Sequence, residues 1–403
     1  MLVTNAIKKC QNGVMNQLTG IPRRGLLMGG ALAAAATLTA CRSQDLSSVP
    51  ASPTAPQDSA APVGATGPVQ AGVDRPGTPQ EHLGLAVFDL GSEREPSAVA
   101  RLLAELGRTI GEVTGGRHQQ MAGLAPGDVT VTVGVGPALV AGVPGVRSDL
   151  PGAAQLPRFA REQIPDAARD GDVLLQVCGS DPLVVSCAEA ACSAVLAGAG
   201  AQVRWSQRGF RPPAGPHAGR NLLGFPDGII VPKGPEQMRR EVWLDGPEPV
   251  TGGTVAVVRR LRIDTDRFLA QPVRRQEEAI GRRRADGAPL SGGDAEAEVD
   301  LGAKTPDGRY LVPPMAHARR ANPLTSGSGL MLRRSYSYRN GPEDAGLVFI
   351  SFQRELRTFV ATQQRLDEGD DLMAFTTATA SGTFLVLPGF DAQRPLGSAL
   401  FGT

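Results

Sequence analysis

The chain is poor in the residue types that most often carry metal or redox chemistry. Its 403 residues include four histidines and five cysteines, and 4% are aromatic. Two cysteines, Cys10 and Cys41, lie near the N-terminus, and the other three show no Cys-x-x-Cys spacing, which argues against a disulfide framework or a thiol metal site. The formal net charge is only +1, without a long basic run, so we expect small-molecule partners and no nucleic acid.

Several common functional motifs are also missing. The sequence has no P-loop, Gly-x-Ser-x-Gly, His-Glu-x-x-His or EF-hand spacing, which removes the commonest hydrolase, zincin and calcium-binding interpretations. Gly134-Val135-Gly136 follows a β-like run but lacks the third glycine of a dinucleotide-binding motif. A redox cofactor held by one imidazole remains compatible with this composition.

The first 41 residues are typical of an export signal. Arg23-Arg24 precedes an apolar, Ala-rich stretch that is too short to span a bilayer, and adjacent arginines favour the twin-arginine route. Leu38-Thr39-Ala40-Cys41 resembles a lipobox in which Cys41 is lipidated, although a plain cleavage site that contains a cysteine is the alternative. We expect a periplasmic or cell-surface protein, lipid-anchored at Cys41, whose translation starts at Met1 or at Met15.

Residues 42–80 are rich in Ser, Pro, Ala and Gly and predict a disordered linker. Beyond them the element order βαββαβ occurs twice, with strands at 83–88, 129–133, 173–177, 202–206, 253–263, 330–338, 345–352 and 382–387, and helices at 96–113, 182–196, 267–283 and 354–365. This order predicts an α+β fold of the dimeric α+β barrel type, with two ferredoxin-like domains at 81–240 and 241–403. Each domain would have an antiparallel sheet with helices on one face.

His317 is the candidate ligand, in a segment between residues 284 and 329 that is too long for a simple connector. A lone histidine is more often a structural group than a ligand. Its neighbours make this one more interesting, because Arg319 and Arg320 can neutralise the propionates of a haem and Asn322 can fix a turn before Pro323.

Asp227 and Arg333 are the candidate acid–base and charge-stabilising groups. Asp227 lies in Gly224-Phe225-Pro226-Asp227-Gly228, where it either closes an ordinary turn or projects a carboxylate that transfers protons. Arg333 lies on an expected strand, where it is either a surface cation or a group that stabilises developing negative charge.

These residues and the blocks around them resemble the dye-decolorising (DyP-type) haem peroxidases, particularly the exported branch similar to the iron-uptake deferrochelatase/peroxidases. The resemblance covers about residues 80 to 390. The blocks that carry it are Arg220 to Gly228, Gly252 to Arg260, Gln276 to Arg282, Gly287 to Gly292, His317 to Pro323, Leu332 to Tyr338 and Gly346 to Phe349.

The resemblance implies one haem b per chain in the C-terminal domain, with His317 as the proximal iron ligand, Asp227 as the distal acid–base and Arg333 as the distal arginine. Arg334 would be the fallback for Arg333. The further expected cofactor contacts are Gly224, Phe225, Gly228, Arg319, Arg320 and Asn322.

The implied activity is reduction of hydrogen peroxide through an oxyferryl intermediate, followed by one-electron oxidation of organic substrates of the dye or phenol type. The alternative is a haem-binding deferrochelatase lipoprotein of iron acquisition, with iron-uptake partners and little turnover. The oligomeric state stays open, and a homo-oligomer is one option.

One departure from the family pattern concerns the residue that orients the proximal histidine. The family often has an acid where this chain has Ala374, and loss of that carboxylate would make the imidazole a weaker donor unless Asp370 or Asp371 replaces it. Ala378 and Ala380 also stand where relatives often have His and Gly.

Overall fold

The computed structural model describes residues 61–92, 94–213 and 219–402. The expected export signal, Cys41 and the first part of the expected linker lie outside the described residues. No helix within the described ranges is both long and apolar enough to cross a membrane.

The first half of the described chain has the strand and helix order predicted from its sequence. Its main elements are β1 (His82–Asp89), α1 (Pro96–Thr114), β2 (Thr130–Val135), β3 (Val173–Gly179), α3 (Pro182–Gly198) and β4 (Gln202–Phe210). Shorter helices are η1 (Gln119–Met121), α2 (Pro137–Ala141) and η2 (Asp166–Ala168). Both long helices begin with proline at the first turn, where no backbone donor is lost, and Asp181 caps α3.

The second half repeats this order with more insertions. Its strands are β5 (Thr254–Ile263), β6 (Leu332–Arg333), β7 (Tyr336–Arg339), β8 (Ala345–Gln353) and β9 (Thr376–Val386). Its helices are α4 (Gly234–Glu241), α5 (Thr265–Leu269), α6 (Val273–Ile280), α7 (His317–Arg320), α8 (Pro323–Ser326), α9 (Leu356–Asp367), η3 (Asp371–Phe375) and α10 (Ser398–Phe401). The single helix predicted over 267–283 is therefore two helices, because Pro272 interrupts the pattern and α6 begins after it.

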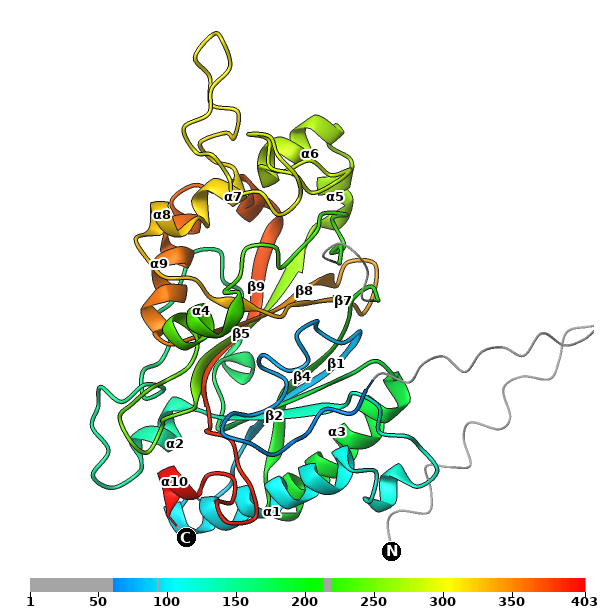
Figure 1. The fold of residues 1–403 in the computed structure, drawn as a ribbon, viewed down its shortest axis with the longest axis vertical. Coiled ribbons are helices and arrows are strands. Elements are labelled where there is room, and N and C mark those ends of the chain that lie inside the picture. The colour runs from blue at the N-terminus through cyan, green and yellow to red at the C-terminus, as the bar shows by residue number, and fades with distance from the viewer. Residues whose placement is uncertain (1–60, 93, 214–218, 403) are drawn as a thin grey trace, which may run out of the picture. The chain divides into compact units, whose positions relative to one another are not determined.

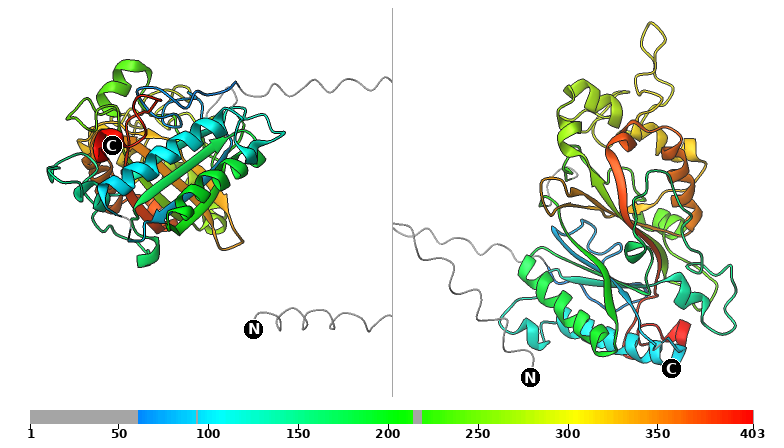
Figure 2. Two further views of the ribbon diagram at one scale, coloured as in Figure 1. Left: turned by 90° about the horizontal axis from the view of Figure 1, so that it is seen from below. Right: turned by 180° about the vertical axis from the view of Figure 1, so that it is seen from behind.

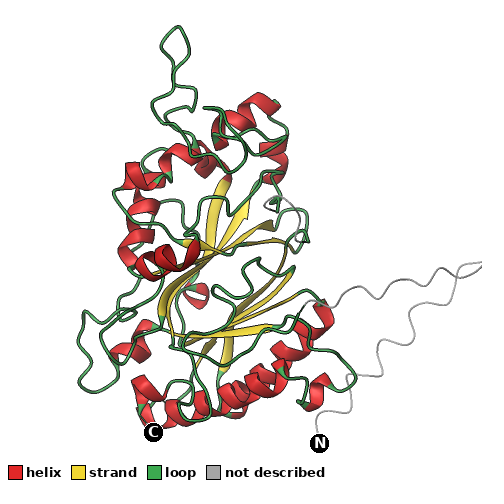
Figure 3. Ribbon diagram, viewed as in Figure 1, coloured by secondary structure: helices red, strands yellow, loops and turns green. Residues whose placement is uncertain are grey.

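The strands form an antiparallel sheet that closes into a barrel. Their order is β5-β9-β2-β3-β1-β4-β7-β8-β6, and an additional pairing of β5 with β8 closes the ring. The four strands of the first half and the five strands of the second half meet at narrow seams: β2 joins β9 through two residue pairs, and β4 joins β7 through one. Figures 1 and 3 show the strands at the centre and helices beyond both sheets. The predicted α+β class is confirmed.

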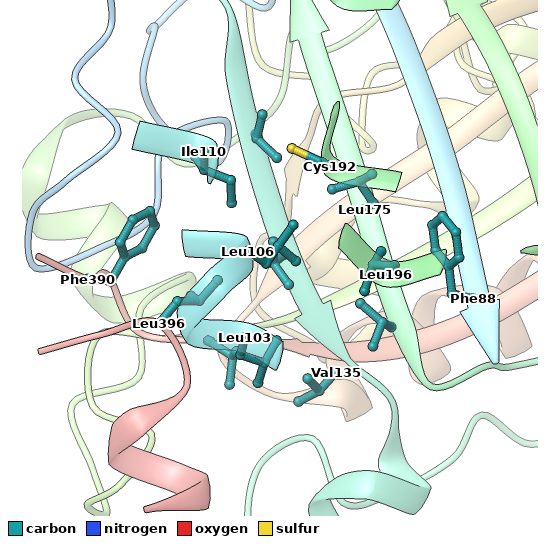
Figure 4. Close-up of a cluster of buried hydrophobic side chains, with 14 of the residues drawn as sticks. Phe88, Leu103, Leu106, Ile110, Val135, Leu175, Cys192, Leu196, Phe390 and Leu396 are labelled. Carbon is teal, nitrogen blue, oxygen red and sulfur yellow. The ribbon is translucent and has the colours of Figure 1, made fainter. Parts of the chain in front are cut away.

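Apolar side chains fill two layers around the first sheet. On its outer face, α1 and α3 lie across the strands and enclose a core that includes Leu103, Leu106 and Cys192 (Figure 2, left, and Figure 4). The barrel interior holds a second core, to which both sheets contribute, with Leu85 and Phe352 among its fully buried members. On the outer face of the second sheet, α9 packs against β5 and β8, and α6 and α7 lie beyond the ends of β5 and β9 (Figure 1).

Residues 61–80 differ from the linker prediction, because much of this stretch packs into the fold. The Gln70 side chain bonds to the backbone of Val133 and Leu387 beside the β2–β9 seam, and Val73 is fully buried in the barrel core. The composition is poor in apolar residues, but strands beside a short seam leave backbone groups that one amide side chain can satisfy. Residues 42–60 lie outside the described ranges.

Candidate active site

Three side chains proposed from the sequence lie in one region of the second half. His317 opens α7, Asp227 follows β4 in the turn before α4, and Arg333 belongs to β6. Desolvation lowers the pKa of His317, but the charge and hydrogen bond of Asp370 outweigh it, so this pKa lies above its ordinary value. Arg333 lowers the same pKa and Asp227 raises it, so both charges act on the imidazole.

Asp370 fixes the orientation of the His317 ring. Nδ1 of His317 lies 2.6 Å from Oδ2 of Asp370, and Oδ1 of the same carboxylate accepts a hydrogen bond from the Leu372 amide at 2.7 Å. A carboxylate only accepts, so the ring proton belongs on Nδ1 and leaves Nε2 as the free lone pair. The His317 side chain is 35% exposed and that of Asp370 is 0% exposed.

Asp370 therefore supplies the carboxylate for His317 that Ala374 cannot supply. Ala374 contributes no side-chain acceptor, but Asp370, four residues earlier at the start of η3, takes that place. The sequence suggested either Asp370 or Asp371, and the structure selects Asp370.

Close backbone packing holds the His317 segment against the chain that carries Asp370. The Asp371 amide donates to the Met315 carbonyl at 2.9 Å. Gly369 allows this approach, because a Cβ there would lie 3.0 Å from the Met315 sulfur and 3.2 Å from Nη2 of Arg320. His317 and its carboxylate partner therefore belong to one rigid pair of segments.

The polar neighbours of His317 serve the local fold rather than an open cavity. Arg319 donates to the carbonyls of Leu301 and Val312, and its guanidinium lies 4.6 Å from the centroid of the Tyr310 ring. Arg320 is 7% exposed and lies 3.8 Å from Glu368.

Asn322 likewise has a local task. Its Oδ1 accepts from the Leu324 amide at 2.9 Å, which makes it the N-cap of α8. The side chains of Arg319 and Asn322 are thus already engaged with protein, whereas the buried Nε of Arg320 has no hydrogen-bond partner within the described residues.

Asp227 is carried by a glycine-rich turn with an anchored hydrophobic base. Gly224 and Gly228 have φ values of +83° and +80°, which side-chain-bearing residues rarely adopt. Phe225 is 2% exposed and packs edge-on against Phe268 at 6.3 Å. The Asp227 carboxylate accepts from the Gly228 amide at 2.7 Å and has no ion-pair partner within the part of the chain that is described.

Arg333 and Arg334 point to opposite faces of the sheet. Arg333 pairs with Ser351 on the outer face, and its guanidinium makes no hydrogen bond or ion pair with the residues that the structure describes. Arg334 is 3% exposed inside the barrel, where its Nη1 donates to the carbonyls of Val73 and Pro76. The structure therefore contradicts Arg334 as a fallback for Arg333, because its guanidinium is buried on the interior side of the barrel and is bound to backbone carbonyls there.

Arg282 is a site residue that sequence reasoning did not single out. It is 6% exposed, and its Nη1 donates to the carbonyls of Gly287 and Ala295. Burial lowers the pKa of Arg282, and the charge of Arg333 lowers it further, so the two cations lie in one region. The sequence feature that could have indicated Arg282 is its place directly after Gly281, which the structure shows in the left-handed region.

These groups fit a haem better than a metal ion held by protein ligands alone. No cluster of three or more His, Cys, Asp or Glu side chains with metal-binding geometry occurs in the described ranges. The site instead offers one imidazole with an anchored Nδ1, and single axial ligation by such a ring is how many haem proteins hold iron. The unpaired Asp227 and Arg333 supply opposite charges near that ring.

Comparisons with known proteins agree with this arrangement. A model described as Dyp-type peroxidase, N-terminal, matches residues 70–211, and one described as Dyp-type peroxidase, C-terminal, matches residues 218–391. The dye-decolorizing peroxidase of Thermobifida fusca is 34% identical over 306 residues, which is 69% of each chain. The deferrochelatase of Escherichia coli (strain K12) is 33% identical over 305 residues, 69% of this chain and 70% of its own.

Solved structures show the same likeness. Ferric DtpA from Streptomyces lividans superposes with a TM-score of 0.79 at 34% identity, covering 86% of this chain and 98% of its own. The DyP-type peroxidase from Cellulomonas bogoriensis has a TM-score of 0.78 at 33% identity, covering 86% and 99%.

Proposed function

Because the chain belongs to the Dyp-type peroxidase family, we propose that His317, Asp227 and Arg333 carry its peroxidase chemistry. Family membership makes the protein a haem-dependent oxidoreductase that uses peroxide as oxidant and organic compounds as reductants. The residue roles and the identity of the cofactor as haem b are the proposal. The observation that carries it is the 2.6 Å contact between His317 and the buried Asp370, with Asp227 and Arg333 acting on the same imidazole.

His317 and Asp370 form the proximal side of the proposed site. Nε2 of His317 would hold the haem iron, and the Asp370 carboxylate would give the ring anionic character that strengthens it as a donor. When bound, the haem supplies the redox-active iron. The close packing of residues 315 and 371 holds the ring in place.

Asp227 and Arg333 form the distal side. The Asp227 carboxylate would accept a proton from one oxygen of peroxide and return it to the other, so that this oxygen could depart as water, while the bound haem would supply the electrons for the cleavage. The Arg333 guanidinium stabilises the negative charge that develops on the departing oxygen as the O–O bond breaks. Neither side chain is committed to an ion pair within the described ranges, so both are free for this work.

The deferrochelatase-like alternative has lost its main structural argument. That argument was the absence of a carboxylate at Ala374, and Asp370 provides the carboxylate. The likeness to deferrochelatases, at 33–34% identity, is what still supports a test for iron release and for iron-uptake partners.

Several finer features complete the proposal. The βαββαβ order of each half supports two ferredoxin-like units, and homo-oligomer formation is a further proposal. Arg23-Arg24 and the lipobox-like sequence before Cys41 support twin-arginine export and lipid anchoring at the cell surface or in the periplasm.

An absorption titration with haem, followed by peroxide, tests the proposed function. The wild type should give a ferric Soret band that changes on addition of peroxide, and His317→Ala should lose the axial-imidazole signature. His118→Gln is the matched control, because His118 is a half-buried histidine that caps a short helix in the other half. A Soret band that peroxide leaves unmoved would favour a haem-binding protein without peroxidase turnover. No Soret band in the wild type would contradict both the peroxidase and the haem-binding hypotheses.

A further inference from the structure

We propose that Glu162 and Arg259 are positioning residues that set the His317–Asp370 hydrogen bond from the other half of the molecule. Glu162 belongs to the segment of residues 150–172, here called the strap, which runs between α2 and β3 in the first half. The strap leaves its own half and lies along β9, with bridges from Glu162 to Ala378 and from Arg169 to Ser381. This inference deepens the proposed function and rests on His317 as the ligand.

A chain of hydrogen bonds joins the strap, β5 and α9 into one circuit. Arg259 on β5 donates to Oε1 of Glu162 at 2.6 Å and to Oε1 of Gln363 on α9 at 3.0 Å. Gln363 in turn donates to Oδ1 of Asp367 at 2.9 Å. The other oxygen of Asp367 accepts from the Ala160 amide of the strap at 3.0 Å, which closes the ring.

The Arg259–Glu162–Gln363 part of this circuit is buried, so its geometry is strongly determined, whereas the Ala160–Asp367 bond lies at the surface. The side chains of Arg259 and Glu162 are 2% and 7% exposed. The Arg259 guanidinium also lies 5.1 Å from the Phe159 ring centroid and 5.9 Å from that of Phe359, one ring from the strap and one from α9. A buried ion pair with additional hydrogen bonds has few alternative arrangements, because any that breaks it leaves an uncompensated charge.

The backbone conformation of the strap also indicates that its position is strongly determined. Arg161 and Asp170, each with φ of 56°, are the two non-glycine residues with positive φ within the described ranges, and both lie in the strap beside its bridges to β9. Such conformations persist where the surroundings over-determine them. The contacts of the strap with β9 and α9 therefore outweigh the conformational free energy that these two residues cost.

The circuit acts on the last turn of α9, and that turn leads directly to Asp370. Asp367 is the final residue of α9, and Asp370 follows three residues later with its carboxylate on His317. Glu368 and Gly369 continue the helical hydrogen bonds to Gln364 and Leu366, so the connection is short and ordered. Fixing Asp367 to the strap thus fixes the start of η3, where Asp370 accepts from His317 and Leu372.

Nuclear magnetic resonance of the haem-free protein labelled with ¹⁵N-histidine measures this effect directly. The chain has four histidines, so few imidazole signals occur, and His317→Ala identifies the one from Nδ1–H of His317. We expect Glu162→Ala to broaden this signal, or to shift it in the direction in which Asp370→Asn shifts it. Glu162→Gln, which keeps an acceptor for Arg259, should restore most of it.

The matched control is Asp344→Ala, which removes the ion-pair partner of Arg260. Arg260 is the next residue on β5, but it faces the opposite side of the sheet, with its guanidinium 4.6 Å from the Tyr338 ring centroid. An unmoved His317 signal in folded Glu162→Ala, or an equal change in Asp344→Ala, would overturn the proposal. If Glu162→Ala fails to fold, Gln363→Leu breaks the circuit while keeping the Arg259–Glu162 pair. An unmoved His317 signal in Gln363→Leu, or an equal change in Asp344→Ala, would then overturn the proposal.

Haem titration gives a second reading that separates this proposal from the proposed function. We expect Glu162→Ala to weaken haem affinity by about tenfold, as loss of outer-shell support commonly does. If the wild type takes up no haem, the proposed function fails, yet the resonance of the haem-free protein still decides whether the strap positions Asp370.

Discussion

The two halves of the molecule use the same order of strands and helices for different purposes. The outer face of the first sheet is covered by α1 and α3, and the layer between is almost entirely apolar. The outer face of the second sheet instead holds buried charge, including Arg259, Arg282 and Asp370. The first half is held mainly by apolar packing, with buried polar groups such as Asp172 and Gln176, whereas the second half buries the charged groups that a site requires.

The largest effect that would separate the halves is loss of proton transfer in the second. Asp227→Asn removes the proposed base, and we expect the rate of reaction with peroxide to fall by roughly 10²–10⁴-fold, or about 3–5 kcal/mol of activation free energy. Stopped-flow absorption of the haem-loaded protein measures it. Haem uptake and thermal stability should stay as in the wild type, and an unchanged rate would remove Asp227 from the mechanism.

In the first half, we expect a core substitution to lower the stability of the fold and to leave haem binding unchanged. Leu103 is fully buried between α1 and the first sheet, and Leu103→Ala should lower the free energy of unfolding by about 2–5 kcal/mol. Denaturant unfolding gives this value. Haem affinity of the folded fraction should not change, and Leu324→Ala, at a residue that is 86% exposed, serves as the control.

A third test uses pH to probe the apolar core. Burial raises the pKa of Cys192 from 9.0 to about 12, so the folded thiol stays protonated where the unfolded one ionises. The stability this provides is complete below pH 9 and is lost as the pH rises towards 12. By about pH 10.5 the loss should reach about 2 kcal/mol, and Cys192→Ala should lack it.

Unfolding of wild type and variant across this pH range measures the difference. Cys187→Ala, on the same helix but only partly buried, is the matched control. Identical pH slopes for the wild type and Cys192→Ala would contradict a protonated thiol in the folded core.

The smallest effect concerns a residue near the ligand that serves the fold. Asn322 caps α8 instead of facing a cavity, so Asn322→Ala should lower stability by about 1 kcal/mol and leave haem affinity unchanged. Calorimetry and haem titration together test this. A large loss of haem affinity at unchanged stability would restore Asn322 as a cofactor contact.

Periodicity and motif spacing predicted most of the fold, because these elements bury regular apolar faces. The strands of the first half and α1 and α3 agree with their predicted positions to within a few residues, whereas Pro272 was overlooked as a helix breaker. Much of 61–80 was expected to be disordered because its contacts are single polar bonds such as those of Gln70. No local pattern signals such bonds.

The site was only partly predictable for a similar reason. His317, Asp227 and Arg333 lie in recognisable sequence blocks, and the structure brings them together. The partner of His317 is 53 residues away, and only the end of α9 places Asp370 beside it. The exclusion of Arg334 could have been foreseen, since two consecutive residues of a strand cannot face the same cavity.

The narrow seams of the barrel have a consequence for how the molecule opens. Only three ladder pairs join the two sheets: Gly134–Val386 and Val135–Leu385 at one seam, and Phe210–Ser337 at the other. Each sheet has far longer ladders within itself. Few ladder bonds therefore join the two sheets directly, and the backbone bonds of the strap to Ala378 and Ser381, together with the shared apolar core of the barrel, add to the cohesion of the halves. Amide hydrogens at the seams should exchange with solvent through a partial opening that leaves both sheets intact.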